Sequence, residues 1–172
     1  MKNSVLVGFK RSPFTVANKG LLASIRPEDI LSQVIRDLIK NTNINKEDIE
    51  DIITGCAYPE GVQGYNIAKI VSFMTDMPEH VGGMTINRWC GSSMQAIHSA
   101  AGAISMNAGK VFICCGVESM TSVPINGLNY SPHPDLLENQ PNVYLSMGLT
   151  AENVAKKFNI SRSEQQEFAI QS

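Results

Sequence analysis

The sequence predicts an α/β fold in which helices pack on a mainly parallel mixed sheet. Short apolar runs of strand length occur at residues 49–57, 84–87 and 111–115. Between them lie segments in which apolar residues recur every three or four positions, as on one face of a helix. Because strands that alternate with helices are typical of a parallel sheet covered by helical layers, this order favours an α/β architecture.

The first expected elements are a strand at residues 5–9 and a helix that begins at residues 26–29 (RPED). Proline fits the first turn of a helix, and acidic residues there favour the positive end of the helix dipole. The helix then carries a single apolar stripe, which predicts one buried face. The stripe consists of Ile30, Leu31, Val34, Ile35, Leu38 and Ile39.

The middle of the chain predicts two further helices. After the strand at residues 49–57 we expect a loop at 61–64 and a short helix at 67–73. Gly82 and Gly83 are expected to break the chain before the strand at 84–87. A small-residue helix follows Cys90 and precedes the strand at 111–115. Its expected apolar face consists of Met94, Ile97, Ala101 and Ile104.

The character of the chain changes after Met120. Residues 121–146 contain four prolines and little periodicity, which predicts a long loop. A helix is expected at residues 150–158, opened by a Thr150 cap. Residues 161–164 (SRSE) match a capping box and predict one more helix.

The composition is that of an ordinary globular chain. It has 172 residues, 43% hydrophobic and 17% charged, with a formal net charge of −2. Its few basic pairs are too small for the positive patch that nucleic acid requires, so we expect no nucleic-acid partner. The sequence contains no apolar run near 18 residues and no secretory signal pattern, so we expect no membrane span and a cytoplasmic location.

The four cysteines show no metal-binding pattern. None forms a C-x-x-C pair, so we expect neither a zinc site nor a thioredoxin-type centre, and no metal. Cys114 and Cys115 should point to opposite faces of a strand and pack in the core. Cys56 ends another apolar run and is interpreted in the same way.

Cys90 differs because it lies where a predicted strand gives way to a helix. Free backbone N–H groups and the positive end of the helix dipole favour the thiolate there. A thiolate at such a junction is a candidate acyl-accepting nucleophile. The alternative interpretation is a buried, inert cysteine.

Four blocks of sequence carry a family resemblance. They are residues 11–14 (RSPF) with 26–29 (RPED), 87–97 (NRWCGSSMQAI), 116–120 (GVESM) and 147–152 (MGLTAE). In order and separation they resemble the thiolases, and among these the bacterial 3-ketoacyl-CoA thiolases (acetyl-CoA acyltransferases) of fatty-acid β-oxidation. The resemblance implies the N-terminal half of a thiolase-like layered fold, with Cys90 forming an acyl-thioester intermediate. Coenzyme A would be a substrate, and no cofactor is expected.

The resemblance also implies a division of the chain. Residues 1–120 would form the N-terminal core half with the nucleophile, and 121–172 the start of an inserted loop region that is truncated. The C-terminal half would be absent, and with it the family's histidine, asparagine and second-cysteine motifs. We therefore expect the isolated chain to be inactive.

The histidines of the chain do not replace the missing base. His98 lies eight residues beyond Cys90, which on a continuous helix is roughly 12 Å along the axis, outside hydrogen-bond reach. It is interpreted as a partly buried helix residue. His80 and His133 are assigned to the surface.

A few other residues are weighed against the resemblance. Met147 aligns with a methionine of the family's acyl pocket, but core filling is equally open. Ser146 stands where many short-chain thiolases have histidine, which argues against an acetoacetyl-CoA thiolase. Glu118 is interpreted as a buried, hydrogen-bonded loop anchor, and Trp89 as packing beside the nucleophile.

The functional alternatives stay open at this point. The first is thiolytic cleavage of a 3-ketoacyl-CoA by CoA, giving acetyl-CoA and a shortened acyl-CoA. Its implied partners are those two substrates, further copies of the chain, and the hydratase/dehydrogenase subunit of a β-oxidation complex. The second is a non-catalytic remnant or split-enzyme half that acts as an interaction module. An acetoacetyl-CoA thiolase or another condensing enzyme of the same fold, such as a ketoacyl synthase, is a weaker alternative.

Overall fold

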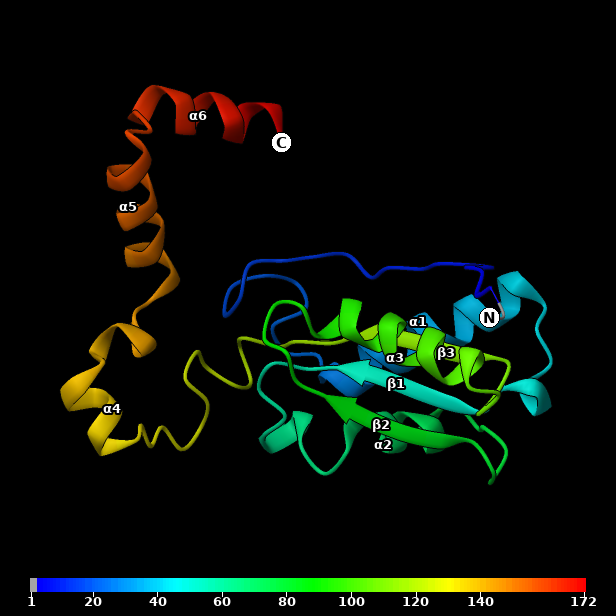
Figure 1. Cartoon of the computed structure of the whole chain (residues 1–172). Helices are drawn as coiled ribbons and strands as arrows, with labels where there is room; N and C mark the ends of the chain where they lie inside the picture. Colours follow the sequence, from blue (N-terminus) through cyan, green and yellow to red (C-terminus); the bar gives the residue numbers. More distant parts are fainter. Residues whose placement is uncertain (1–2) are drawn as a thin grey trace. The chain divides into compact units, whose positions relative to one another are not determined.

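The computed structural model describes residues 3–172, and the chain divides into two compact units, Met1–Asn129 and Tyr130–Ser172. The first unit is built on three parallel strands in the order β2-β1-β3 (Figure 1). These strands are β1 (Asp51–Gly55), β2 (Gly82–Ile86) and β3 (Phe112–Gly116). The α/β class and the parallel pairing are therefore confirmed.

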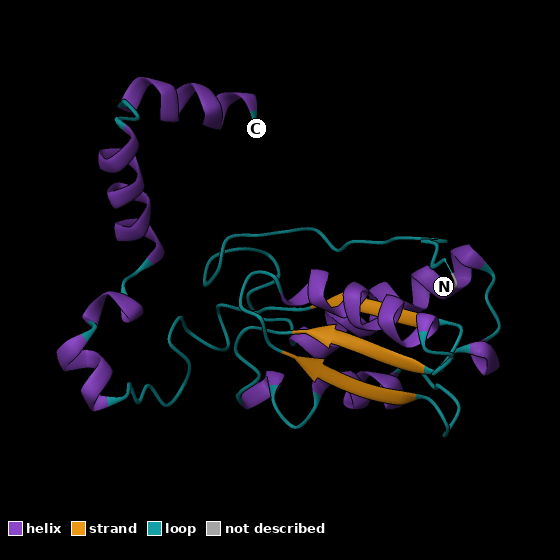
Figure 2. Cartoon of the chain, viewed as in Figure 1, coloured by secondary structure: helices purple, strands orange, loops and turns teal. Residues whose placement is uncertain are grey.

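Helices cover both faces of this sheet, as Figure 2 shows. Helices α1 (Pro27–Thr42) and α2 (Ile67–Met74) pack on one face, where Ile52 and Ile113 join their apolar core. Helix α3 (Ser92–Ser105) packs on the other face, against Ile53. Short 3-10 turns, Lys46–Asp48 and Gly61–Gln63, precede β1 and α2, and the second occupies the predicted loop. The result is a layered helix–sheet–helix arrangement.

Alternation along the strands separates neighbouring side chains between the two faces. Cys115 packs with the cluster under α1 and α2, whereas Cys114 packs with the cluster under α3. The expectation that these cysteines point to opposite faces is confirmed, because successive side chains of a strand alternate. The burial of Cys56 is confirmed as well, since only 1% of it is exposed.

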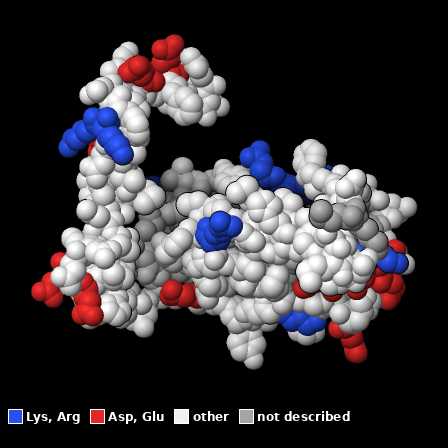
Figure 3. Space-filling model, in the orientation of Figure 1, with Lys and Arg blue, Asp and Glu red and all other residues white. Residues whose placement is uncertain are grey.

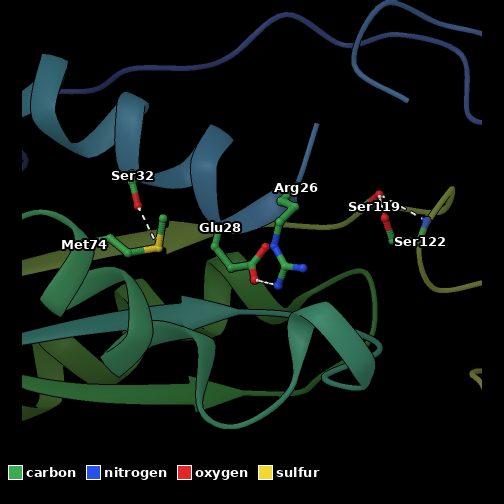
Figure 4. Close-up of polar contacts among 6 residues, drawn as sticks. All are labelled: Arg26, Glu28, Ser32, Met74, Ser119 and Ser122. Atoms are coloured by element: carbon green, nitrogen blue, oxygen red, sulfur yellow. Dashed lines mark hydrogen bonds and ion pairs between the residues drawn. The ribbon is translucent and has the colours of Figure 1, made fainter. Parts of the chain in front are cut away.

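Helix α1 begins and packs as its sequence predicts. Leu31 and Ile35 of the apolar stripe are buried in the core. Figure 4 shows the first turn, where the Arg26 guanidinium pairs with the buried carboxylate of Glu28. One turn later the Ser32 hydroxyl lies 3.7 Å from the Met74 sulfur of α2. These contacts tie the start of α1 to its neighbours.

Gly82 and Gly83 do not break the chain, and the expectation was wrong at these residues. Both belong to β2 and pair with Asp51 and Ile52 of β1. A Cβ at Gly83 would lie 2.5 Å from the backbone nitrogen of Lys69. Glycine is present because helix α2 approaches the strand too closely for a side chain, and not because the strand ends.

Residues 5–9 do not form a strand, which corrects the first predicted element. Val5, Leu6 and Val7 are 72–79% exposed, and none of the three described strands pairs with them. The segment instead passes close to the end of α1, where a Cβ on Gly8 would meet the side chain of Thr42. A strand depends on hydrogen bonds from a neighbour, which local sequence cannot supply.

The second unit, Tyr130–Ser172, contains more helix than the sequence predicts. Within the predicted loop lie α4 (Pro134–Asn139) and a 3-10 turn, Pro141–Tyr144. Helix α5 (Met147–Phe158) begins three residues before Thr150, because the Ser146 hydroxyl accepts the N–H of Leu149 and forms the cap. Helix α6 (Arg162–Gln171) has the predicted capping box, in which Ser161 and Glu164 bond reciprocally.

We expect Asp51→Asn to stabilise the first unit. The Asp51 Oδ1 atom is buried without a hydrogen-bond partner, and burial raises the pKa of this carboxyl. The native state therefore holds the proton more tightly than the unfolded state, and stability falls as pH rises through the window between the two pKa values. At pH 7 a neutral amide should raise the free energy of unfolding by about 1 kcal/mol. Urea melts at pH 7 and near pH 4 measure this difference.

The exposed Asp48 offers a matched control, since Asp48→Asn should change stability little at either pH. The gain in Asp51→Asn should shrink at the lower pH, because the raised pKa lets the wild-type carboxyl take up a proton as the pH falls. An equal gain at both values would contradict burial of the charge as its cause.

Candidate active site at the carboxyl ends of the strands

Cys90 lies in the turn that joins β2 to α3, at the carboxyl ends of the parallel strands. Open α/β sheets usually bind their ligands at this edge. Gly91 caps α3, so Cys90 comes one residue before the helix cap. Among the four cysteines only Cys90 is exposed. The expectation of a junction position is confirmed, and Cys90 is not buried.

Side chains within the turn fix its backbone. Trp89 adopts a left-handed conformation with φ of +49°, which bulky residues rarely adopt. The Asn87 Oδ1 atom accepts the N–H of Trp89 at 2.9 Å. The Ser92 hydroxyl accepts the N–H of Arg88 at 2.8 Å and donates to the carbonyl of Trp89 at 2.6 Å. The residue before Cys90 is therefore held by two polar side chains.

The start of α3 packs directly on the sheet. A Cβ at Gly55 would lie 2.5 Å from the backbone of Ser92 and Ser93, and one at Gly116 would meet the Ser93 hydroxyl. The buried face of α3 is its thin one, carrying Ala96 and Ala100.

The predicted apolar face of α3 is exposed in part. Met94 is 59% exposed and Ile97 50%. Only the alanine face is narrow enough to follow the sheet so closely, so the larger side chains point away from it.

Glu118 anchors the loop that follows β1. Its carboxylate accepts the N–H of Ala57 at 2.7 Å, the N–H of Tyr58 at 3.4 Å and the side-chain amide of Gln63 at 2.8 Å. The role of loop anchor is confirmed, but the residue is exposed and not buried as expected. Just beyond Glu118, the Ser119 hydroxyl donates to the Ser122 hydroxyl at 3.1 Å, as Figure 4 shows.

The other three cysteines are poor nucleophiles. Burial, and after it the nearby carboxylate of Glu118, raise the pKa of Cys56 to about 12. Burial also raises the pKa of Cys115 to about 12. The pKa of Cys114 is raised for the same reason. Nucleophilic attack requires a thiolate, whereas these three thiols stay protonated at neutral pH.

The histidines lie outside the Cys90 turn. His98 is exposed on α3, which corrects the expectation of partial burial, because it lies on the side of the helix away from the sheet. His80 is exposed, with its Nδ1 atom 3.9 Å from a carboxylate oxygen of Glu47. His133 is exposed at the cap of α4. The surface assignment of His80 and His133 is confirmed.

Met147 is the first residue of α5, in the second unit. It is 71% exposed, so it does not fill a core. It lines an apolar groove between α5 and α6. The other lining residues are Thr150, Ala151, Val154, Ala155, Ile160 and Gln165. A role for Met147 in an acyl pocket stays a prediction.

Sequence reasoning missed the residues that shape the turn. Ser92 bonds within the turn, Asn87 joins the turn to the loop after β1, and Gln63 joins that loop to Glu118; none of the three belongs to an apolar pattern. The serine at 92 could have been noticed, since serine often bonds to backbone near a helix start. The bonds of Asn87 and Gln63 to other loops leave no local signal.

The surface adds little to this picture of the site. On the face drawn in Figure 3, Lys and Arg side chains form small separate groups among mostly uncharged residues. Across residues 3–172, no helix combines the length and the apolar character needed to cross a membrane.

Comparisons with known proteins give one consistent result. The family described as "Thiolase, N-terminal domain" matches residues 4–172. The 3-ketoacyl-CoA thiolase of Bacillus subtilis (strain 168) is 40% identical over the whole chain, and that of Aeromonas hydrophila is 39% identical. In each case the match covers 44% of the relative, so the chain spans less than half the length of these proteins.

Solved structures agree. Human mitochondrial 3-ketoacyl-CoA thiolase in complex with CoA superposes with a TM-score of 0.81 and 27% identity, covering 96% of this chain and 45% of that one. The Acat5 thiolase from Ascaris suum in complex with coenzyme A gives 0.75 and 27%, covering 90% and 43%.

Proposed function

Because this chain belongs to the thiolase family, we propose that it supplies the nucleophile of an acyltransferase that cleaves 3-ketoacyl-CoA with CoA. The observation that carries the proposal is the contrast among the cysteines. Cys90 is exposed in a fixed turn before α3, whereas Cys56, Cys114 and Cys115 have raised pKa values. The names of the relatives support the choice of substrates, since they are 3-ketoacyl-CoA thiolases.

The proposed reaction has two steps, acylation of Cys90 and transfer of the acyl group to CoA. The Cys90 thiolate attacks the 3-keto carbonyl, the bond between C2 and C3 breaks, and an acyl thioester forms on sulfur. The departing carbanion takes a proton and becomes acetyl-CoA. The thiol of a second CoA, after losing its proton, attacks the thioester, and the shortened acyl-CoA leaves with Cys90 restored as thiolate.

Thiolysis also needs a base and an oxyanion site. We propose that these groups lie in the part of the relatives that this chain does not cover. The proposed setting is fatty-acid β-oxidation in the cytoplasm, in a homo-oligomer and in association with a hydratase/dehydrogenase subunit. Within this setting, the names of the relatives support the 3-ketoacyl-CoA substrate.

Acyl trapping tests the proposal directly. The 172-residue chain is incubated with acetoacetyl-CoA or a longer 3-ketoacyl-CoA at pH 8, and its peptides are analysed by mass spectrometry. Turnover needs the base and oxyanion groups proposed to lie outside this chain, whereas a single acylation needs the Cys90 thiolate, so we expect the Cys90 peptide to gain the corresponding acyl mass slowly and without turnover. Hydroxylamine should remove the acyl group. Cys90→Ala should show no such product.

The two acyl donors also compare substrate classes. A longer acyl group that accumulates faster than acetyl would favour a 3-ketoacyl-CoA thiolase over an acetoacetyl-CoA thiolase. Absence of any acyl-Cys90, in a folded chain whose Cys90 still reacts with small alkylating reagents, would favour the non-catalytic interaction module.

A further inference from the structure

The Asn87 side chain joins the Cys90 turn to a second loop. On one side its Oδ1 atom accepts the N–H of Trp89 at 2.9 Å. On the other side its Nδ2 atom donates to the carbonyl of Ala57 at 2.8 Å. A single carboxamide thus bridges the residue before Cys90 and the loop that follows β1.

The loop at the far end of this bridge is itself fixed. The Ala57 N–H and the Tyr58 N–H both donate to the Glu118 carboxylate. The Tyr58 ring also meets the Trp89 ring edge to face, with centroids 5.3 Å apart. A continuous series of contacts therefore crosses the carboxyl ends of the three strands, from Glu118 after β3, through Ala57 after β1, to Asn87 after β2.

The conformation of Trp89 shows why the turn needs support. A left-handed backbone is unfavourable for a residue with a large side chain. Such residues persist only where surrounding contacts hold them. Here the contacts are the bonds from Asn87 and Ser92 and the ring of Tyr58. Relaxation of Trp89 would move Cys90 relative to the first turn of α3.

We propose that Asn87 is a positioning residue for Cys90, acting through Trp89, with Glu118 fixing the Ala57 loop to which Asn87 bonds. The proposal rests on the proposed function, in which Cys90 is the nucleophile. It adds that the geometry of the nucleophile is set by a bridge between two loops.

Trp89 provides the means to test this role, because it is the only tryptophan of the chain. Time-resolved fluorescence anisotropy of Trp89 reports the mobility of the turn, and mass spectrometry reports the rate of Cys90 alkylation by iodoacetamide. Both are measured for the wild type, Asn87→Ala, Asn87→Asp and Glu118→Gln, with circular dichroism to confirm folding. Asn87→Asp keeps an acceptor for the Trp89 N–H and loses the donor to Ala57.

Asn66→Ala is the matched control. Asn66 makes an equivalent pair of bonds, donating to the carbonyl of Gly83 and accepting the Thr85 hydroxyl, each at 2.8 Å. It also has a positive φ of +56°, so its replacement should destabilise the fold at least as much. Its bonds do not involve residues 87–91, so it should leave Trp89 and Cys90 unchanged.

We expect Asn87→Ala to mobilise Trp89 and to slow alkylation of Cys90 about fivefold, the factor that corresponds to the loss of one typical hydrogen bond. Asn87→Asp should retain much of the Trp89 order, and Glu118→Gln should have a smaller effect in the same direction. Unchanged anisotropy and rate in a folded Asn87→Ala chain would overturn the positioning role, as would equal effects from Asn66→Ala.

Failure of the proposed function gives a different result. In that case the wild-type Cys90 would not be acylated by a 3-ketoacyl-CoA, although iodoacetamide would still alkylate it. The Trp89 anisotropy of Asn87→Ala still decides whether Asn87 holds the turn. If Asn87→Ala does not fold, the Trp89 anisotropy and the Cys90 alkylation rate of Asn87→Asp test the positioning role instead. Because Asn87→Asp loses only the bond to Ala57, we expect a partial effect on both.

Discussion

Limiting iodoacetamide is expected to alkylate Cys90 at least about fiftyfold faster than Cys56 or Cys115. At pH 8 a thiol with a pKa of about 12 is thiolate in roughly one molecule in ten thousand, so almost none of Cys56 or Cys115 is in the reactive form. A more basic thiolate is a stronger nucleophile. This partly compensates, by a factor of some tens, for the small thiolate fraction of Cys56 and Cys115. Burial of Cys56 and partial burial of Cys115 then hinder the reagent further.

Mass spectrometry of the labelled peptides measures the four rates. The selectivity for Cys90 should decline as the pH rises toward 12, because Cys56 and Cys115 then gain thiolate. In urea the four cysteines should react at similar rates. Labelling led by Cys56, Cys114 or Cys115 in the folded chain would refute the nucleophile assignment.

The fold could be predicted wherever a short segment contains its own signal. The apolar runs at residues 49–57 and 111–115 became strands, and the stripe after residue 26 became α1. The run at residues 5–9 has the same local pattern and is not a strand, because pairing depends on a neighbour distant in sequence. Gly82 and Gly83 were misinterpreted for a related reason, since the approach of α2 to β2 is a tertiary contact.

The candidate site was also predictable only where its signals are local in the sequence. The position of Cys90 follows from a strand that ends and a small-residue helix that begins, and both signals lie within residues 84–104. The bonds that shape its turn join residues far apart along the chain. Asn87 and Ala57 are 30 positions apart, and Glu118 and Ala57 are 61 apart. A single sequence contains no local trace of such pairs, so the residue types at 87 and 118 are explained only once the strands are aligned.

We expect Gly55→Ala to be among the most damaging single-methyl changes in the first unit. The added Cβ would lie 2.5 Å from the backbone carbonyl carbon of Ser92 and the nitrogen of Ser93, so the start of α3 itself would have to move. Overpacking of this kind destabilises by about 1–3 kcal/mol, and a backbone obstacle belongs at the upper end. Against a total stability of about 5–15 kcal/mol, much of the margin would be lost. The shift would also displace the turn that carries Cys90.

Gly116 and Gly102 of the same unit provide reference substitutions against which Gly55→Ala can be measured. At Gly116 the added Cβ meets the Ser93 hydroxyl, which can rotate away, so Gly116→Ala should lose about 1 kcal/mol or less. Gly102 lies within α3 and has no atom within 4 Å of the added Cβ, so Gly102→Ala should gain about 0.5–1 kcal/mol from helix propensity. Urea melts of the three variants should therefore rank Gly102→Ala above the wild type, Gly116→Ala slightly below it and Gly55→Ala far below. If Gly55→Ala matched Gly116→Ala, the start of α3 could not be packed on β1 as closely as the structure shows, and the position of Cys90 would be less constrained than the Asn87 bridge requires.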